Sequence, residues 1–358
     1  MKSLNVFARL IWMVNVLFAL TLLASSLSSL LPPSELPLLS VFGLLFPFWL
    51  LINMVFMIGW MIRLKPHFLL SFLAILLSWK DVAAWIRWAE VQPVNGSSKE
   101  LSVMSYNVRL FNRLGWIEQD GVPESIARLI DRADPSILCI QEYHKRAATP
   151  KLDFPHSYVW TTGARKVFGM SIMSQYPILD TGSVAYGDAL TGTLNQRFIW
   201  ADIRVDRDTL RVVNAHLSSI RLRKSDIEVV QGHLPTDDPK DLKKEVWQIG
   251  GRIQRALVQH GQQIDVLMAF AENSPHPLIV CADLNETGSG YCHAQLESRL
   301  QDSFRQAGKG LGATYPRIGF PLRIDHIFLD PSFEVRSHKV IREKLSDHYP
   351  VQVSFSFR

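Results

Sequence analysis

The chain has 358 residues and a formal net charge of +5, and most of its basic excess lies in the first 99 residues. That stretch holds seven Lys and Arg against three Asp and Glu, which leaves 31 basic and 30 acidic residues for 100–358. The near-neutral remainder argues against a strongly basic nucleic-acid-binding platform. Two of the three cysteines, Cys139 and Cys281, lie inside apolar runs, which favours buried free thiols over a disulfide framework. No Cys-x-x-Cys pair is present, which argues against a structural zinc site.

Three apolar runs fill most of the first 90 residues and predict a membrane anchor over 1–90. We expect about three transmembrane helices, near 10–31, 36–62 and 68–88. The third run is the shortest of the three, and a helix lying in the membrane interface is the alternative to a third span. The first two runs carry Asn15 and Asn53 but no ionisable residue, which favours an anchor over a channel or transporter.

Basic residues flank these runs unevenly and predict an orientation. Lys2 and Arg9 precede the first run, and Arg63 and Lys65 lie between the second and the third. The positive-inside rule places both segments in the cytoplasm. Three crossings of the inner (cytoplasmic) membrane then put the rest of this multi-pass chain on the periplasmic side. The side is inverted if the third run does not cross.

Residues 91–99 have the composition of a linker, and short strands and amphipathic helices begin after it, so a soluble domain is expected over 100–358. Strands are expected at 101–106, 136–140, 158–161, 170–173, 197–205, 210–215, 278–282, 324–329, 333–340 and 351–357. Helices are expected at 123–132, 242–270 and 291–300. The polar stretch 220–241 is expected to be an exposed excursion that, with the loop 111–116, lines the substrate side.

Polar side chains able to bind metal or phosphate recur at the ends of the predicted strands. They are Asn107, Glu142, His216, Asp283, Asn285, Asp325, Asp347 and His348. Each alone is typical of a turn or cap, but strand ends of one layered sheet meet at one rim. Carboxylate and amide oxygens suit Mg²⁺ or Mn²⁺, and an Asp–His couple can take a proton from water. This combination predicts phosphoryl hydrolysis, whereas no Gly-x-Ser-x-Gly elbow or Walker loop is present.

Seven short stretches, in order, resemble the endonuclease/exonuclease/phosphatase superfamily of deoxyribonuclease I-like proteins, as a membrane-anchored bacterial member. They read MSYNV at 104–108, IQE at 140–142, GMSIMS at 169–174, NAHL at 214–217, ADLN at 282–285, RIDHI at 323–327 and SDHYPV at 346–351. The resemblance covers 101–358 and leaves the N-terminal helices outside it. It implies a four-layer α/β/β/α sandwich of two mostly antiparallel sheets.

The resemblance also implies a divalent-metal site. Glu142 would be the principal ligand of Mg²⁺ or Mn²⁺, helped by Asn107 and Asp347. No obligate protein partner is implied, and the substrate would be a phosphate ester of nucleic acid or of a phospholipid- or sphingolipid-like molecule.

The remaining site residues are implied to act on water and phosphate. His348 would be the base or a phosphate contact, and Asp325 would orient it. Asp283 would position or deprotonate the water, Asn285 would hold the water and phosphate, and His216 would contact the scissile phosphate. The choice between Asp283 and His348 as the base stays open.

Three positions depart from the family pattern. Ala282 stands where Gly usually precedes the Asp, and Glu286 begins a loop that differs from the usual Asp-x-Pro. His326 stands where an aromatic residue is common, and alternation along a strand predicts that it points away from Asp325. A membrane-anchored metal-dependent phosphoesterase is the leading interpretation, and a non-catalytic module that binds a phosphorylated ligand is its alternative.

Overall fold

The computed structural model describes residues 6–88, 99–145, 149–163, 167–187, 196–220, 239–316 and 320–358. The predicted linker at 91–99 lies outside these residues except for Lys99, and so does most of the predicted excursion at 220–241.

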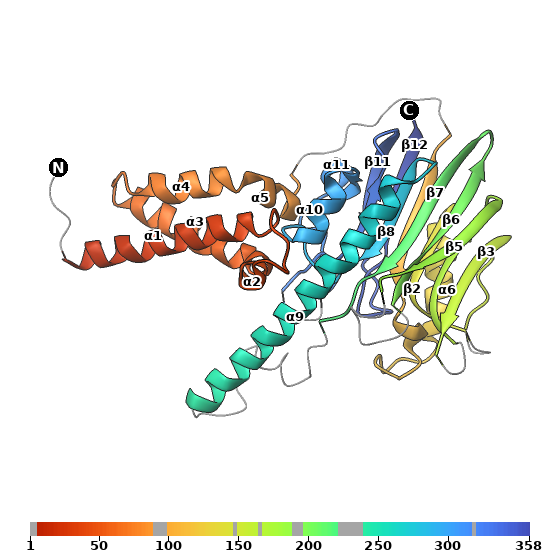
Figure 1. Ribbon diagram of the computed structural model, residues 1–358, viewed down its shortest axis with the longest axis horizontal. Helices are drawn as coiled ribbons and strands as arrows, with labels where there is room; N and C mark the ends of the chain where they lie inside the picture. Colours follow the sequence, from red (N-terminus) through yellow and green to blue (C-terminus); the bar gives the residue numbers. More distant parts are fainter. Residues whose placement is uncertain are drawn as a thin grey trace.

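Two six-stranded sheets formed by the described residues pack face to face (Figure 1). The first has the spatial order β11 (Phe333–Val340), β12 (Val351–Phe357), β1 (Leu101–Asn107), β2 (Ile137–His144), β4 (Phe168–Ser174) and β3 (His156–Thr162). The second has the order β5 (Ile178–Ala185), β6 (Arg197–Val205), β7 (Asp208–His216), β8 (Leu278–Asp283), β10 (Asp325–Leu329) and β9 (Gln301–Asp302). β1 pairs in parallel with β2, and β7 with β8; the other named pairs are antiparallel. The expected pair of mostly antiparallel sheets is confirmed.

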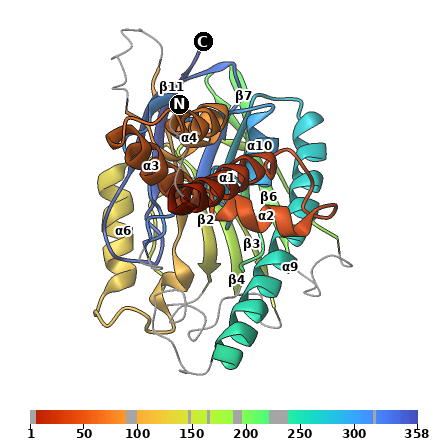
Figure 2. The same cartoon turned by 90° about the vertical axis from the view of Figure 1, so that its left-hand side faces the viewer.

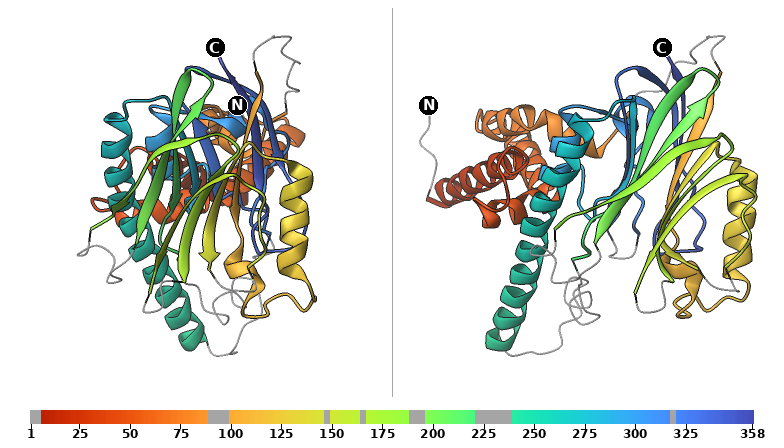
Figure 3. Two further views of the ribbon diagram at one scale, coloured as in Figure 1. Left: turned by 90° about the vertical axis from the view of Figure 1, so that its right-hand side faces the viewer. Right: turned by 45° about the vertical axis from the view of Figure 1, so that its right-hand side comes forward.

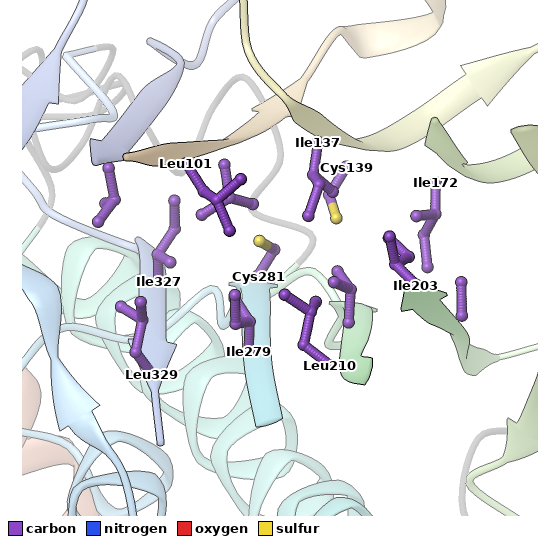
Figure 4. Packing of buried hydrophobic residues seen from close by; sticks show 14 of the residues in the cluster. Leu101, Ile137, Cys139, Ile172, Ile203, Leu210, Ile279, Cys281, Ile327 and Leu329 are labelled. Carbon is purple, nitrogen blue, oxygen red and sulfur yellow. The ribbon is translucent and has the colours of Figure 1, made fainter. Parts of the chain in front are cut away.

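Alternating side chains build the layer between the sheets. Leu101, Cys139 and Ile172 of the first sheet meet Ile203 and Cys281 of the second in one buried apolar cluster (Figure 4). Residues of opposite parity face outward on each sheet, where helices cover them. This alternation fixes which polar residues point inward where the apolar rows end.

Helices complete the four layers. α6 (Val122–Ala133) packs on the outer face of the first sheet, and α9 (Pro239–Glu272) with α10 (Tyr291–Glu297) packs on the outer face of the second (Figure 3). Short helices η1 (Arg109–Asn112) and α11 (Ser303–Ala307) follow β1 and β9. The expected α/β/β/α order of layers matches this arrangement.

Residues 6–85 form a helical unit beside the sandwich (Figures 1 and 2). Its helices are α1 (Val6–Leu27), α2 (Pro37–Leu44), α3 (Phe46–Ile62), α4 (Phe68–Leu77) and α5 (Trp79–Trp85). Among the described residues, α1 is the one helix that is by itself long and apolar enough to cross a membrane. The expectation of about three continuous transmembrane helices is therefore corrected to one clear candidate.

The other two predicted spans, at 36–62 and 68–88, are each broken. α2 and α3 meet at a bend of 63°, and α4 and α5 at a bend of 69°. The first break falls at Leu45, two residues before Pro47, whose ring and missing N–H interrupt a helix at that point. Ser78 separates the second pair with non-helical dihedrals. Hydropathy carries no information on such bends, which is why the sequence predicted unbroken helices.

Candidate active site

Strand parity brings the polar strand ends together at one end of the sandwich. The inward row of β8 runs Ile279, Cys281 and then Asp283, so the carboxylate continues the apolar row beyond the core. Asp283 is in register with His216 of β7 on one side and with Asp325 of β10 on the other. These three predicted site residues therefore lie on neighbouring strands of one sheet.

Asp283 is the centre of the group and is completely buried. Its Oδ2 accepts a hydrogen bond from Asn107 Nδ2 at 2.9 Å, which joins the two sheets across the gap between them. The same oxygen lies 3.6 Å from His216 Nε2 and 3.8 Å from His348 Nδ1. One carboxylate thus contacts a residue from each of three other segments.

His348 and Asp325 form the predicted imidazole–carboxylate couple. His348 Nδ1 lies 2.9 Å from Asp325 Oδ2 and 3.2 Å from Oδ1. Burial alone lowers the pKa of His348, but the charges of Asp325 and Asp283 outweigh it and raise this pKa to about 10. The ring is therefore held as an imidazolium that donates to Asp325.

Glu142 reaches the site through a β-bulge. By simple alternation it would share the outer face with Ile140, which packs in the cluster under α6. The pairing of β2 with β4 shifts register between Ile140 and Tyr143, and Glu142 adopts a φ of +50°. Bulges of this kind re-aim a side chain near functional sites. Glu142 Oε1 thereby comes within 3.4 Å of Asn107 Nδ2.

Asp347 belongs to the same end of the sandwich but is paired with a cation. Arg109 Nη1 lies 2.9 Å from Asp347 Oδ2, and its guanidinium stacks on the ring of Trp116 at 3.9 Å. Arg109 was not among the predicted site residues. Its position two residues after Asn107 was the available signal, but residues 109–112 all have left-handed φ values, which no sequence pattern indicated.

The donor set fits a hard divalent cation. Glu142, Asp283, Asp325 and Asp347 bring four carboxylates to this end of the sandwich, against the cations Arg109 and His348. The excess negative charge and the oxygen donors are those that Mg²⁺ and Mn²⁺ prefer. Within this set, Asp283, Asp325 and His348 offer ligand atoms that lie within 4.8 Å of one another.

Asn285 sits beside the group but is turned toward the backbone. Its Nδ2 donates to the Leu217 carbonyl at 3.0 Å, and its N–H donates to Asp283 Oδ1 at 3.1 Å. Its φ of +50° is a left-handed value that Asn tolerates better than most residues. The side chain thus ties the loop after β8 to the end of β7. The predicted separation of His326 from Asp325 agrees with the structure, where His326 Nε2 lies against the Glu286 carbonyl.

Glu286, the residue after Asn285, forms a buried pair with His260. Glu286 Oε2 and His260 Nδ1 lie 3.9 Å apart, and neither has a hydrogen-bond partner among the described residues. His260 Nε2 is against the Ser218 carbonyl, so that nitrogen carries the proton and Nδ1 is an acceptor. Burial raises the pKa of Glu286 to about 7 and lowers that of His260 to about 4. At 3.9 Å the two atoms are too far apart for a hydrogen bond, so burial rather than pairing is the main cause of both pKa shifts.

A Glu286→Gln variant is expected to flatten the pH dependence of stability between pH 5 and 8. Because the pKa of Glu286 is raised in the folded state from 4.5 to about 7, its stabilising contribution is complete below about pH 4.5 and is lost as the pH rises through 7. A pKa shift of this size corresponds to about 3 kcal/mol in the free energy of unfolding. Thermal unfolding across this range measures the effect. A variant whose melting temperature falls as steeply as that of the wild type would contradict the assignment.

Comparisons with known proteins identify the family of the chain. A model of the endonuclease/exonuclease/phosphatase family matches residues 104–348, and a model described as a domain of unknown function (DUF8431) matches residues 8–85. No curated protein sequence matched the chain. The endonuclease/exonuclease/phosphatase match covers more than half of the chain and includes every predicted site residue.

Solved structures of low identity share the fold of the two-sheet domain. A mannosyl-6-phosphatase from Bacteroides thetaiotaomicron VPI-5482 is 18% identical with a TM-score of 0.53, covering 72% of this chain and 100% of that chain. An endonuclease/exonuclease/phosphatase from Bacteroides vulgatus is 15% identical with a TM-score of 0.53, covering 73% and 100%. A humanized D. rerio TDP2 is 16% identical with a TM-score of 0.50, covering 72% and 99%. The site geometry and the family match lead to one conclusion: this chain belongs to the endonuclease/exonuclease/phosphatase family.

Proposed function

We propose that the protein is a membrane-anchored, divalent-metal-dependent phosphoesterase that hydrolyses a phosphodiester by attack of water. The observation that carries the proposal is the meeting of Asn107, Asp283, Asp325 and His348 from both sheets at one end of the sandwich. Binding a phosphorylated ligand alone, which is the alternative function, does not require an imidazole oriented by one carboxylate and flanked by a second.

The roles of the residues follow from their contacts. Asp325 and Asp283 both approach His348 Nδ1, at 2.9 Å and 3.8 Å, and two carboxylates beside one imidazole favour the imidazolium. We therefore assign proton acceptance from water to Asp283 and contact with the phosphate oxygens to the charged His348. His216, which is partly exposed beside Asp283, is assigned to the leaving group or the scissile phosphate.

Glu142, Asn107 and Asp347 are the residues that would hold the metal. When bound, Mg²⁺ or Mn²⁺ supplies Lewis-acid polarisation of the phosphoryl oxygen and offsets charge on the leaving oxygen. Arg109 supports this arrangement, because its Nη1 lies 2.9 Å from Asp347 Oδ2 and holds that carboxylate in place. Asn285 is assigned to shaping the loop beside Asp283 through its bond to the Leu217 carbonyl.

The helical unit is proposed as a multi-pass anchor in the inner membrane. α1 supplies one span, and the pairs α2–α3 and α4–α5 supply two more if each bent pair crosses. If both bent pairs cross, Lys2 before α1, Arg9 in its first turn, and Arg63 and Lys65 before α4 put the catalytic domain on the periplasmic side. A tethered active site brings phospholipid- or sphingolipid-like phosphodiesters within reach, and nucleic acid is the other proposed substrate.

Activity of the full chain in detergent tests the proposed function. Bis(p-nitrophenyl) phosphate is expected to be hydrolysed with Mg²⁺ or Mn²⁺ and not after chelation with EDTA. A parallel panel of DNA, RNA, sphingomyelin and phospholipid then identifies the substrate class. Tight, metal-independent binding of a phosphorylated ligand without turnover would instead support the non-catalytic module.

A further inference from the structure

The N-terminal helices contact the loop that follows Asp283. Trp85, at the end of α5, donates from Nε1 to the hydroxyl of Ser289 at 3.1 Å, and that hydroxyl donates to the Gly43 carbonyl of α2 at 3.1 Å. Both Trp85 and Ser289 are buried. One hydroxyl, four positions beyond Asn285, therefore joins the catalytic domain to two helices of the N-terminal unit.

Arg323 makes a second connection, from the segment that leads into β10. Its side chain is buried, and Nη2 donates to the Ala84 carbonyl of α5 at 2.8 Å and to Asp302 Oδ2 at 3.0 Å. Arg323 precedes Asp325, the carboxylate that orients His348, by two residues. A buried guanidinium that loses such a partner is costly to the fold, so this contact holds the start of β10 against α5.

The two connections meet at Gly288, where the loop and α5 come closest. A Cβ atom built at Gly288 would lie 2.8 Å from Arg323 Nη2 and 3.0 Å from the Ala84 carbonyl oxygen. Further along the chain, Arg87 and Gly310 exchange two backbone hydrogen bonds, of 3.0 Å and 2.9 Å. The interface thus combines specific polar contacts and close backbone approach with apolar packing, in which the ring of Phe320 lies against Phe48 and Trp85.

A buried group beside this interface has the composition of a metal site but a different role. His293, Asp302 and His326 offer ligand atoms within 4.8 Å of one another. Arg323 already supplies the positive charge there, because it pairs with Asp302 and places Nη1 2.7 Å from His326 Nδ1. We therefore interpret the group as the buried binding partners of the Arg323 guanidinium rather than as a metal site.

We infer that α5, supported by α2, positions the catalytic residues and is not only part of a tether. It holds the loop 284–290, which carries Asn285, and the segment 323–325, which leads into Asp325. The matched domain of unknown function ends at residue 85, where α5 ends, so the inference gives that domain a role. It rests on the proposed function, because the positioned residues are those of the proposed phosphoesterase site.

A Gly288→Ala variant of the full chain tests this inference. The added methyl group presses the loop away from α5, and a displacement of this order costs about 10- to 100-fold in kcat. KM for bis(p-nitrophenyl) phosphate is expected to stay near the wild-type value. The thermal unfolding midpoint is expected to fall, because Arg323 and the Ala84 carbonyl must move, so kcat is measured well below that midpoint, where a purely structural defect leaves kcat unchanged. Gly59→Ala, at a glycine with open space around it, is the matched control. A wild-type kcat in Gly288→Ala overturns the inference.

Trp85→Phe is the second variant, should Gly288→Ala fail to fold. It removes the indole N–H group that donates a hydrogen bond to the Ser289 hydroxyl and keeps most of the aromatic packing. A fall in kcat at unchanged KM is expected, while Trp88→Phe, at an exposed indole, is expected to behave as the wild type. An unchanged kcat for Trp85→Phe overturns the inference.

Cleavage of the chain within 91–98 provides a readout that does not depend on turnover. A protease site introduced there in the full chain is cut in detergent, and the two fragments are expected to copurify and to keep their activity. Fragments that separate with activity intact would show that the helices are only a tether. An inactive uncut wild type would count against the proposed function alone, because copurification of the fragments still reports the interface.

Discussion

An Asp283→Asn variant is expected to hydrolyse phosphodiesters about 10²- to 10⁴-fold more slowly than the wild type, which is the range for loss of a general base. The amide has almost the same volume as the carboxylate but cannot accept a proton from water at neutral pH. It also has one acceptor oxygen where the carboxylate has two, so one of the hydrogen bonds from Asn107 Nδ2 and the Asn285 N–H is lost. The chemical step and the local hydrogen bonding are therefore both affected. Steady-state kinetics with bis(p-nitrophenyl) phosphate measure the loss.

Asp206→Asn is the matched control for this substitution. Asp206 lies in the turn between β6 and β7, at the opposite end of β7 from His216, and pairs with Lys99 on the exposed surface. An exposed ion pair contributes little to stability, so this variant is expected to keep wild-type kinetics and melting temperature. If Asp283→Asn were as active as Asp206→Asn, the assignment of Asp283 as the proton acceptor would be wrong.

The inward rows of strand residues explain why much of the site was predictable. Asn107, Asp283 and Asp325 share parity with Val103, Cys281 and Ile327, which form the core between the sheets. A residue that continues such a row beyond the core must point into the same gap. Alternation along the sequence and the order of the motifs were therefore sufficient to predict that these three side chains lie together.

Other parts of the site depend on local backbone geometry that sequence patterns do not encode. Glu142 has the parity of an outward residue and reaches Asn107 because of the bulge in β2 and its left-handed φ. Arg109 reaches Asp347 through a run of left-handed residues. The strand β5, with Asp180 and Gly182 in its middle, lacked the apolar alternation that identified the other strands, and it was not predicted.

The contacts between the helical unit and the catalytic domain were also beyond sequence reasoning. Arg323 reads as part of a family motif, but nothing in the sequence indicates that its guanidinium reaches the Ala84 carbonyl, 239 residues earlier in the chain. Hydropathy treats 68–88 as one apolar run, whereas the bend at Ser78 turns α5 out of line with α4 and against the catalytic loop. Long-range packing decides both features.

A Glu142→Gln variant is expected to lose the stabilisation that Mg²⁺ gives to the wild type, together with at least about 10²-fold in activity at a fixed Mg²⁺ concentration. A ligand that binds the folded state raises its free energy of unfolding in proportion to the logarithm of ligand concentration over Kd. Removing the charged oxygen of the principal ligand raises that Kd. The readout is the change in melting temperature of the full chain as Mg²⁺ is titrated, which requires no substrate.

The same variant separates a metal-binding role from a structural one. Without metal, Glu142 is one of four carboxylates crowded at this end of the sandwich, and removing one of them relieves repulsion. Glu142→Gln is therefore expected to be at least as stable as the wild type in EDTA and less stable than it in Mg²⁺. Glu343→Gln, which removes an exposed partner of Arg132, is expected to keep the wild-type response to Mg²⁺. A Glu142→Gln protein that is destabilised in EDTA, or that retains the full Mg²⁺ response, would contradict the assignment of Glu142 as the principal metal ligand.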